Sequence, residues 1–187
     1  MDFCTEALIQ WIKVQKKHAG QELNSGAFPH MITLPPGFGG VYLCDDDCSV
    51  VSSELYKEFV VPYNSRVLKA FGGGTIHFCG TAIHQLENFL QTDGITGINN
   101  FCMGDFRQVI KMQELFENKI ALMVCDFTPL KINSYYTKLF SVLKRKGTIL
   151  ASFVAPELAL NEGKYEIVSR KSREMTETLV DLFTRFK

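Results

Sequence analysis

The chain has 187 residues, of which 46% are hydrophobic, and this is typical of a globular domain with its own core. Twenty basic and twenty acidic residues cancel, so no broad field attracts nucleic acid or an anionic membrane surface. Charges interrupt the opening MDFCTEALIQWIKVQKK before a signal-peptide core could form, and no apolar run is long enough to span a membrane. We therefore expect a cytoplasmic protein that binds neither nucleic acid nor membranes.

Six cysteines are scattered along the chain, at positions 4, 44, 48, 79, 102 and 125. Without a secretory signal, this pattern argues against a disulfide framework. We expect free thiols or metal ligands.

The elements begin with a helix predicted over residues 2–19 and a loop that reaches residue 37. Residues 38–187 hold the remaining elements of what we expect to be a single domain, 1–187. Five β-rich segments are bounded by glycine, asparagine or aspartate: 39–44, 74–79, 95–101, 120–125 and 147–154.

Segments with helical spacing of apolar residues lie between these strands. Ser52 or Ser53 can cap the first, whose predicted buried stripe is Leu55, Phe59, Tyr63, Val67 and Phe71, with a kink or break at Pro62. Thr81 can cap a second that buries Ile83, Leu86 and Leu90. Further helices are predicted to begin at Asp105 and Ser134, and a last one covers residues 164–186.

Strands that alternate with helices require crossover connections and a parallel sheet, so the predicted fold class is α/β. The five units can belong to an open doubly wound sheet or to part of an eight-stranded barrel, which normally needs about 200–250 residues. The glycine-rich GFGG and FGGGT precede their strands, so they do not match a dinucleotide-binding fingerprint.

The strand ends are unusually polar. In order they carry Asp45, Asp46 and Asp47; His77 and Cys79; Asn99 and Asn100; Cys125 and Asp126; and Ser152. In parallel α/β folds the chemistry gathers outside these carboxyl ends. Reading these strand ends in order is therefore a test of function.

His77 and Cys79 point to the same face because side chains alternate along a strand, and their Cα atoms lie about 6.6 Å apart. Zinc bonds of about 2.0 Å to nitrogen and 2.3 Å to sulfur can close on such a pair. Cys125 is the first candidate for a third ligand; the three aspartates and Cys102 are the alternatives. The competing interpretation is a histidine bonded to a backbone carbonyl and a cysteine that packs in the core.

Residues 43–100 combine four features: an aspartate-rich strand end, a helix reading S-x-x-x-Y-x-x-F-V-x-P-Y, H-x-C-G on the next strand, and a helix leading to G-I-T-G-I-N. In this combination the chain resembles the C-terminal part of the uroporphyrinogen decarboxylase superfamily, which includes zinc-dependent methyltransferases that serve corrinoid proteins. The similarity continues through KIALMVCDFTPL and GTILASFVAP.

The resemblance implies a TIM-barrel-type fold, of which this chain would hold the last five units as a partial barrel. H-x-C-G is similar to the zinc motif of the methyltransferase branch, which implies His77 and Cys79 as ligands. That branch takes its third ligand from a cysteine soon after the last strand. Here no cysteine follows Cys125, so Cys125 or an acidic group would have to replace it.

Three functions are compatible with these features. The leading hypothesis is zinc-assisted methyl transfer from a corrinoid, carried by a partner protein, to a small thiol acceptor. The second is cofactor-free decarboxylation of a uroporphyrinogen-type substrate, in which one of Asp45, Asp46 and Asp47 stabilises a protonated pyrrole. The third is a non-catalytic assembly module that self-associates or pairs with a missing N-terminal half. Every arginine falls on a predicted helix rather than at a strand end, which counts against the second.

Overall fold

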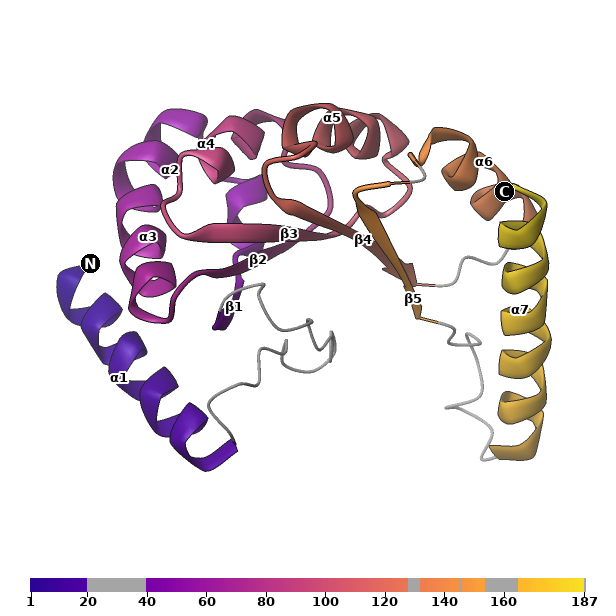
Figure 1. Ribbon diagram of the computed structural model, residues 1–187, viewed down its shortest axis with the longest axis horizontal. Helices are drawn as coiled ribbons and strands as arrows, with labels where there is room; N and C mark the ends of the chain where they lie inside the picture. Colours follow the sequence, from indigo (N-terminus) through magenta and orange to yellow (C-terminus); the bar gives the residue numbers. More distant parts are fainter. Residues whose placement is uncertain (20–39, 128–131, 145, 154–164, 187) are drawn as a thin grey trace.

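The computed structural model describes residues 1–19, 40–127, 132–144, 146–153 and 165–186. Five strands form one sheet: β1 (Val41–Cys44), β2 (Gly74–Cys79), β3 (Ile95–Phe101), β4 (Ala121–Phe127) and β5 (Thr148–Phe153). Neighbouring strands are parallel, and their order in the sheet is their order in the sequence (Figure 1). The predicted α/β class is confirmed, and every strand begins and ends within two residues of its predicted bounds.

The helices are α1 (Asp2–Ala19), α2 (Ser53–Phe59), α3 (Val61–Ala70), α4 (Leu86–Leu90), α5 (Phe106–Phe116), α6 (Ile132–Val142) and α7 (Tyr165–Arg185), with short 3-10 turns η1 (Asp46–Ser49) and η2 (Ile83–Gln85). Helices α2 to α6 cover one face of the sheet, while α1 packs beside α3 and α7 beside α6 (Figure 1). Among the described helices, none has both the length and the apolar character that a membrane crossing requires. The predicted loop that ends at residue 37 lies outside the described residues.

Helix starts follow the sequence signals in two places. Ser52 and Asp105 are the N-caps of α2 and α5, and each side chain accepts hydrogen bonds from first-turn amides. Pro62 lies in the first turn of α3, where it needs no helical hydrogen-bond partner, and the chain breaks between α2 and α3 at Val60. The predicted break at Pro62 is therefore confirmed.

The buried side of α2 differs from the prediction. Leu55 and Phe59 are 51% and 47% exposed, whereas Tyr56 is fully buried. The Tyr56 hydroxyl donates to Asp45 at 2.5 Å, and its ring packs edge-on against Phe89 of α4. This contact turns α2 by one residue, so the prediction was wrong for Leu55 and Phe59. In α3, Val67 is buried as predicted.

Thr81 does not begin a helix, contrary to the prediction. Its hydroxyl donates to Asp105 at 2.8 Å, and η2, which precedes α4, has Ala82 at its N-cap with no side-chain hydrogen bond. Ile83 is 39% exposed as a result, while Leu86 is buried as predicted.

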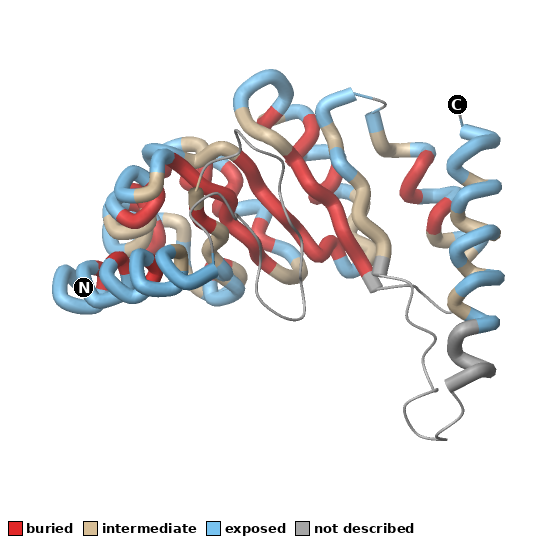
Figure 2. The backbone as a smooth tube through the Cα atoms, turned by 60° about the horizontal axis from the view of Figure 1, so that its bottom comes forward, coloured by how far each residue is buried: buried red, intermediate tan, exposed pale blue. Residues whose placement is uncertain are grey.

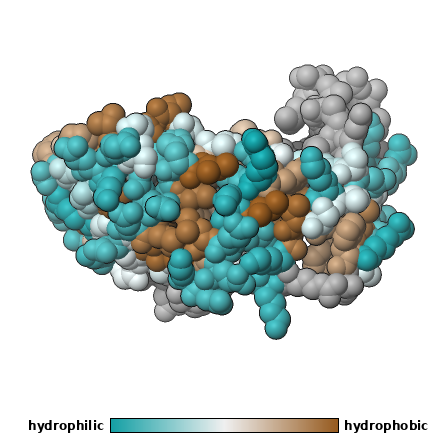
Figure 3. Space-filling view, turned by 90° about the horizontal axis from the view of Figure 1, so that it is seen from above, coloured by the Kyte–Doolittle hydropathy of each residue, from teal (hydrophilic) through white to brown (hydrophobic). Residues whose placement is uncertain are grey.

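The core lies between the sheet and the helix layer, and buried residues are concentrated in the strands (Figure 2). Alternate strand residues such as Ile76, Phe78, Ile98 and Val124 are fully buried. Seen from above, the outer surface of the helix layer carries many hydrophilic residues between apolar patches (Figure 3). The second face of the sheet also carries buried side chains, among them His77 and Asn99.

Candidate metal centre

Polar and sulfur side chains line the face of the sheet that points away from α2 to α6. The register pairs Cys44 with His77 and His77 with Asn99, so these side chains share a face. Phe101 of β3 is paired with Cys79 of β2 on one side and with Cys125 of β4 on the other, so both cysteines lie on this same face. The neighbouring Phe78 points the other way and stacks on Phe89.

The imidazole of His77 is fully buried and is held at one nitrogen by Asn99. Nδ1 lies 2.6 Å from Oδ1 of Asn99, which also accepts the Tyr42 hydroxyl at 2.5 Å. The Asn99 amide nitrogen donates to the Met123 carbonyl oxygen at 3.3 Å, and this fixes which amide atom is the oxygen. Nδ1 must therefore carry a proton to donate, and a neutral His77 presents an unprotonated Nε2, the form that binds metals.

Three candidate ligands gather on the Nε2 side. The ligand atoms of Cys44, Asp46 and His77 all lie within 4.8 Å of one another. Nε2 is 3.7 Å from Oδ1 of Asp46, and Sγ of Cys44 is 3.5 Å from Oδ2 of the same carboxylate. Donors around a tetrahedral zinc ion stand about 3.5 Å apart. The cluster is thus close to the size of a zinc site.

Cys79 also lies beside the imidazole, with Sγ 3.3 Å from Nε2. The predicted pair of His77 and Cys79 is therefore brought together. The amide of Cys79 donates to Oδ1 of Asp46 at 2.7 Å, which ties the 3-10 turn after β1 to the end of β2. This bond fixes the Asp46 carboxylate between the two strands.

The environment keeps both nearby thiols protonated in the metal-free protein. Burial raises the pKa of Cys44 to about 11, and the Asp46 carboxylate adds to the rise. Burial and the same carboxylate raise the pKa of Cys79 to about 12. A divalent cation reverses this effect, because its charge favours the thiolate.

Only Asp46 of the three predicted aspartates faces these thiols. Asp45 points toward the helix layer, where Oδ2 accepts the Tyr56 hydroxyl at 2.5 Å and the Asn64 amide at 2.9 Å. Burial raises the pKa of Asp45 despite these two hydrogen bonds. Asp47 is exposed within η1. Asp45 therefore fixes the end of β1 to α2 and α3, and Asp47 lies outside the candidate centre.

Cys125, the first candidate for the third ligand, lies on the other side of the imidazole. Its sulfur accepts the Asn99 amide at 3.1 Å, so Asn99 stands between it and Nδ1 of His77. It is fully buried, and burial raises the pKa of its thiol to about 12. In the part of the chain that the structure describes, Cys125 does not join a three-residue ligand group.

Cys102 is also separated from the cluster. Its thiol lies 3.4 Å from Oδ2 of Asp126, which accepts the Gly104 amide at 3.2 Å and the Tyr135 hydroxyl. Asp126 follows Cys125 on β4 and so points to the helix side. These contacts connect the end of β3 with β4 and α6 on the helix-covered face of the sheet.

Cys44, Tyr42 and Asn99 were not predicted from the sequence to form one site. Tyr42 and Cys44 are two residues apart on β1, as His77 and Cys79 are on β2. This two-residue spacing was the sequence signal that could have placed Tyr42 and Cys44 on one face of the sheet. The decisive information is the register, which sets Cys44 opposite His77. Asn99 was noted as a polar strand end, but its role depends on the same alignment.

A separate cleft of about 810 Å³ lies between α7, α6 and β5. Its lining is mainly apolar and includes Leu150, Leu179 and Phe183, with Ser152 on the strand side. Ser152, the predicted polar end of the fifth strand, contacts the Tyr136 hydroxyl there. It therefore belongs to the helix side and not to the candidate metal centre.

Comparison with known proteins finds no relative: no family model, no curated protein sequence and no solved structure matches the chain.

Proposed function

We propose that the chain is a uroporphyrinogen-decarboxylase-like protein of the TIM-barrel type whose strand ends hold a zinc ion and use it for methyl transfer to a thiol. The observation that carries this proposal is the group formed by Cys44, Asp46 and His77, in which Nδ1 of His77 is bound by Asn99 and Nε2 faces the other two ligands. Nitrogen, sulfur and carboxylate donors are the set that zinc prefers. The H-x-C-G resemblance supplies the reaction class.

In this proposal His77, Cys44 and Asp46 would hold the zinc ion, and Cys79, whose Sγ is 3.3 Å from Nε2 of His77, lies close enough to be a fourth ligand. When bound, zinc would lower the pKa of a small thiol acceptor and so favour its thiolate. The reaction would transfer a methyl group from a corrinoid partner to that sulfur: the S–C bond would form as the C–Co bond breaks, and the bonding electron pair would stay on cobalt.

The experiment is elemental analysis of the purified full chain beside single variants. We expect about one zinc ion per chain in the wild type, loss in His77→Ala and Cys44→Ser, and retention in Cys125→Ser. Cys125→Ser is the matched control because it removes a thiol from the same face without removing a proposed ligand. Absence of zinc, with a melting temperature that neither zinc nor a chelator moves, would contradict the proposal.

Decarboxylation receives less support from the same residues. Asp45 is engaged by Tyr56 and Asn64, which leaves Asp46 as the aspartate beside His77. The arginines in the described segments lie on α3, α5 and α7 and not at strand ends. Turnover of a uroporphyrinogen that survives His77→Ala would favour decarboxylation over the zinc proposal.

The assembly alternative is favoured by one observation. In the described residues β1 and β5 each have a single neighbouring strand, so the sheet has two edges. Edges of parallel sheets are normally covered or paired. A chain could both assemble and bind zinc. Elemental analysis tests the zinc role, and measurement of the oligomeric state tests the assembly role.

A further inference from the structure

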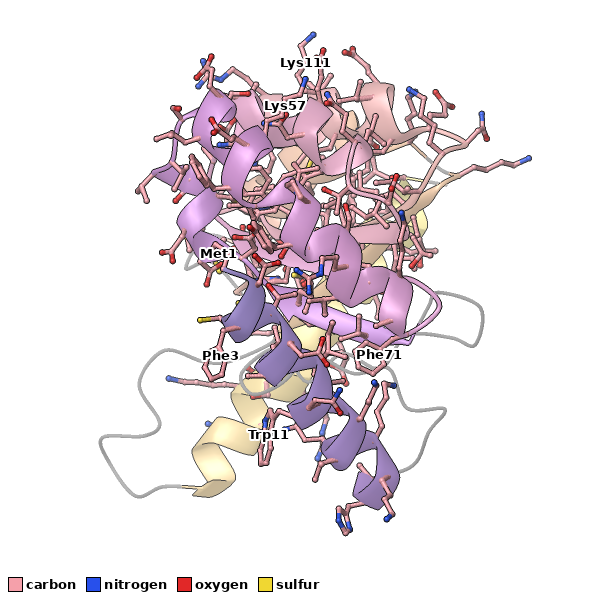
Figure 4. All side chains as sticks on the ribbon, turned by 90° about the vertical axis from the view of Figure 1, so that its left-hand side faces the viewer. Met1, Phe3, Trp11, Lys57, Phe71 and Lys111 are labelled. Atoms are coloured by element: carbon pink, nitrogen blue, oxygen red, sulfur yellow. The ribbon has the colours of Figure 1, made fainter. Side chains whose placement is uncertain are left out.

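Helix α1 has two apolar sides, and only one is covered. Thr5, Ile9 and Ile12 are buried where α1 packs beside α3. A second row at alternating spacings of three and four residues is exposed: Cys4, Ala7, Trp11 and Val14, flanked by Phe3 and Leu8. Phe3 is 85% and Trp11 59% exposed, and Figure 4 shows both projecting from the same side of the helix. Exposed apolar rows of this kind mark association surfaces.

The charges of α1 are divided along its length. Asp2 and Glu6 lie in its first half, and Lys13, Lys16 and Lys17 lie in its second half. Asp2 pairs with Arg66 of α3 at 2.5 Å, whereas Glu6 accepts a hydrogen bond from Gln10 on the same helix. Two such helices placed side by side attract each other only when they are antiparallel, because a parallel pair would bring like charges together.

We propose that α1 is a self-association surface, on which α1 of a second copy of this chain packs in the antiparallel direction. The three-and-four spacing of Cys4, Ala7, Trp11 and Val14 is the seam of a left-handed helix pair. A symmetric pair requires the same patch on both copies, and an antiparallel arrangement satisfies this with a twofold axis between Ala7 and Trp11, so that Trp11 of each copy faces Ala7 of the other. The acidic half of each helix then lies beside the basic half of the other.

The arrangement makes a register-specific prediction. With the axis between Ala7 and Trp11, Glu6 of one copy lies beside Lys13 of the other, because both residues are on the same side of the seam as Phe3. One helix pair buries less area than the roughly 1,200 Å² of a standard interface. We therefore expect a weak dimer with a dissociation constant of about micromolar order. The inference is independent of the metal centre.

The test is sedimentation of the full chain over a range of concentrations, with tryptophan fluorescence recorded in parallel. Trp11 is the single tryptophan, so its emission should shift to shorter wavelength as the dimer forms, with the same midpoint. Trp11→Ala should weaken the dimer by about tenfold or more, since central aromatic residues dominate interfaces. Val50→Ala is the control, because Val50 is 81% exposed and lies outside α1. Circular dichroism checks that each variant is folded.

A charge exchange tests the direction of the pair. Glu6→Lys and Lys13→Glu should each weaken association by about threefold, and the two changes together should restore it. A chain that stays monomeric at all concentrations overturns the proposal. So does a dimer that Trp11→Ala leaves unchanged, because its interface must then lie elsewhere, on a sheet edge for example.

Discussion

Asn99 binds His77 through the same amide oxygen that accepts the Tyr42 hydroxyl. The His77 Nδ1 to Asn99 Oδ1 distance is 2.6 Å and the Tyr42 hydroxyl lies 2.5 Å from the same oxygen. The Asn99 amide nitrogen is directed at Met123 and Cys125. Three strands therefore fix the orientation and tautomer of one imidazole, the role that outer hydrogen-bond partners have in metal sites.

Replacing Asn99 by leucine should lower zinc affinity by roughly ten- to a hundredfold, because Nδ1 loses its acceptor and the ring loses its fixed orientation. Asn99→Asp is the matched variant, since it keeps an oxygen acceptor for Nδ1, and it should retain most of the affinity. The measurement is competition with a chelator of known zinc affinity. Equal affinity in Asn99→Leu and the wild type would show that His77 does not need this partner.

A second prediction compares two neighbouring carboxylates. Asp46 lies 3.7 Å from Nε2 of His77, whereas Asp47 is exposed within η1. Zinc at a hundredfold excess over its dissociation constant should raise the melting temperature of the wild type by roughly 5–10 °C. Asp46→Asn should reduce this rise, and Asp47→Asn should leave it intact. Thermal unfolding with and without zinc measures both, and equal responses would remove Asp46 from the ligand set.

A third prediction concerns the contact between Tyr56 and Asp45. Tyr56→Phe removes one of two hydrogen bonds to a largely buried carboxyl group and should lower the free energy of unfolding by about 1–3 kcal/mol. Tyr63→Phe is the control, with an expected change within about 0.5 kcal/mol, because Tyr63 is only half-buried. Denaturant titration gives both values. A zinc affinity that also falls in Tyr56→Phe would mean that Asp45 positions the metal centre.

The strands and several helix boundaries could be predicted because their signals are local. Glycine and polar residues bound each strand, Ser52 and Asp105 accept first-turn amides, and Pro62 cannot continue a helix. The common face of His77 and Cys79 followed from the alternation of side chains along a single strand. None of these inferences requires knowledge of which segments meet.

The third ligand could not be predicted because it depends on strand register. Cys44 and Cys125 are both thiols near strand ends, and nothing local distinguishes them. The register sets Cys44 beside His77 and places Asn99 between His77 and Cys125. The buried side of α2 was predicted wrongly at Leu55 and Phe59 for a related reason, since the Asp45 partner that holds Tyr56 inward belongs to another element.

A fourth prediction uses the buried thiol of Cys102. Burial raises its pKa from 9.0 to about 11, with a further rise from Asp126 that the hydrogen bond with Tyr135 opposes. The folded protein therefore holds this proton more tightly than the unfolded chain. The contribution of this pKa shift to the free energy of unfolding is fully present below pH 9 and is lost as the pH rises through about 11. A two-unit shift limits the loss to about 2.7 kcal/mol.

The measurement is the free energy of unfolding between pH 8 and 11 in wild type and Cys102→Ala. Other buried thiols also titrate late, as for Cys125, whose pKa burial raises to about 12. Both proteins should therefore lose stability at high pH, but the wild type should lose about 2 kcal/mol more across this range. The difference between the two curves isolates Cys102, because the cavity left by alanine lowers stability equally at every pH. Parallel curves would mean that the thiol titrates near its ordinary pKa, so that water reaches the contact between Cys102, Asp126 and Tyr135.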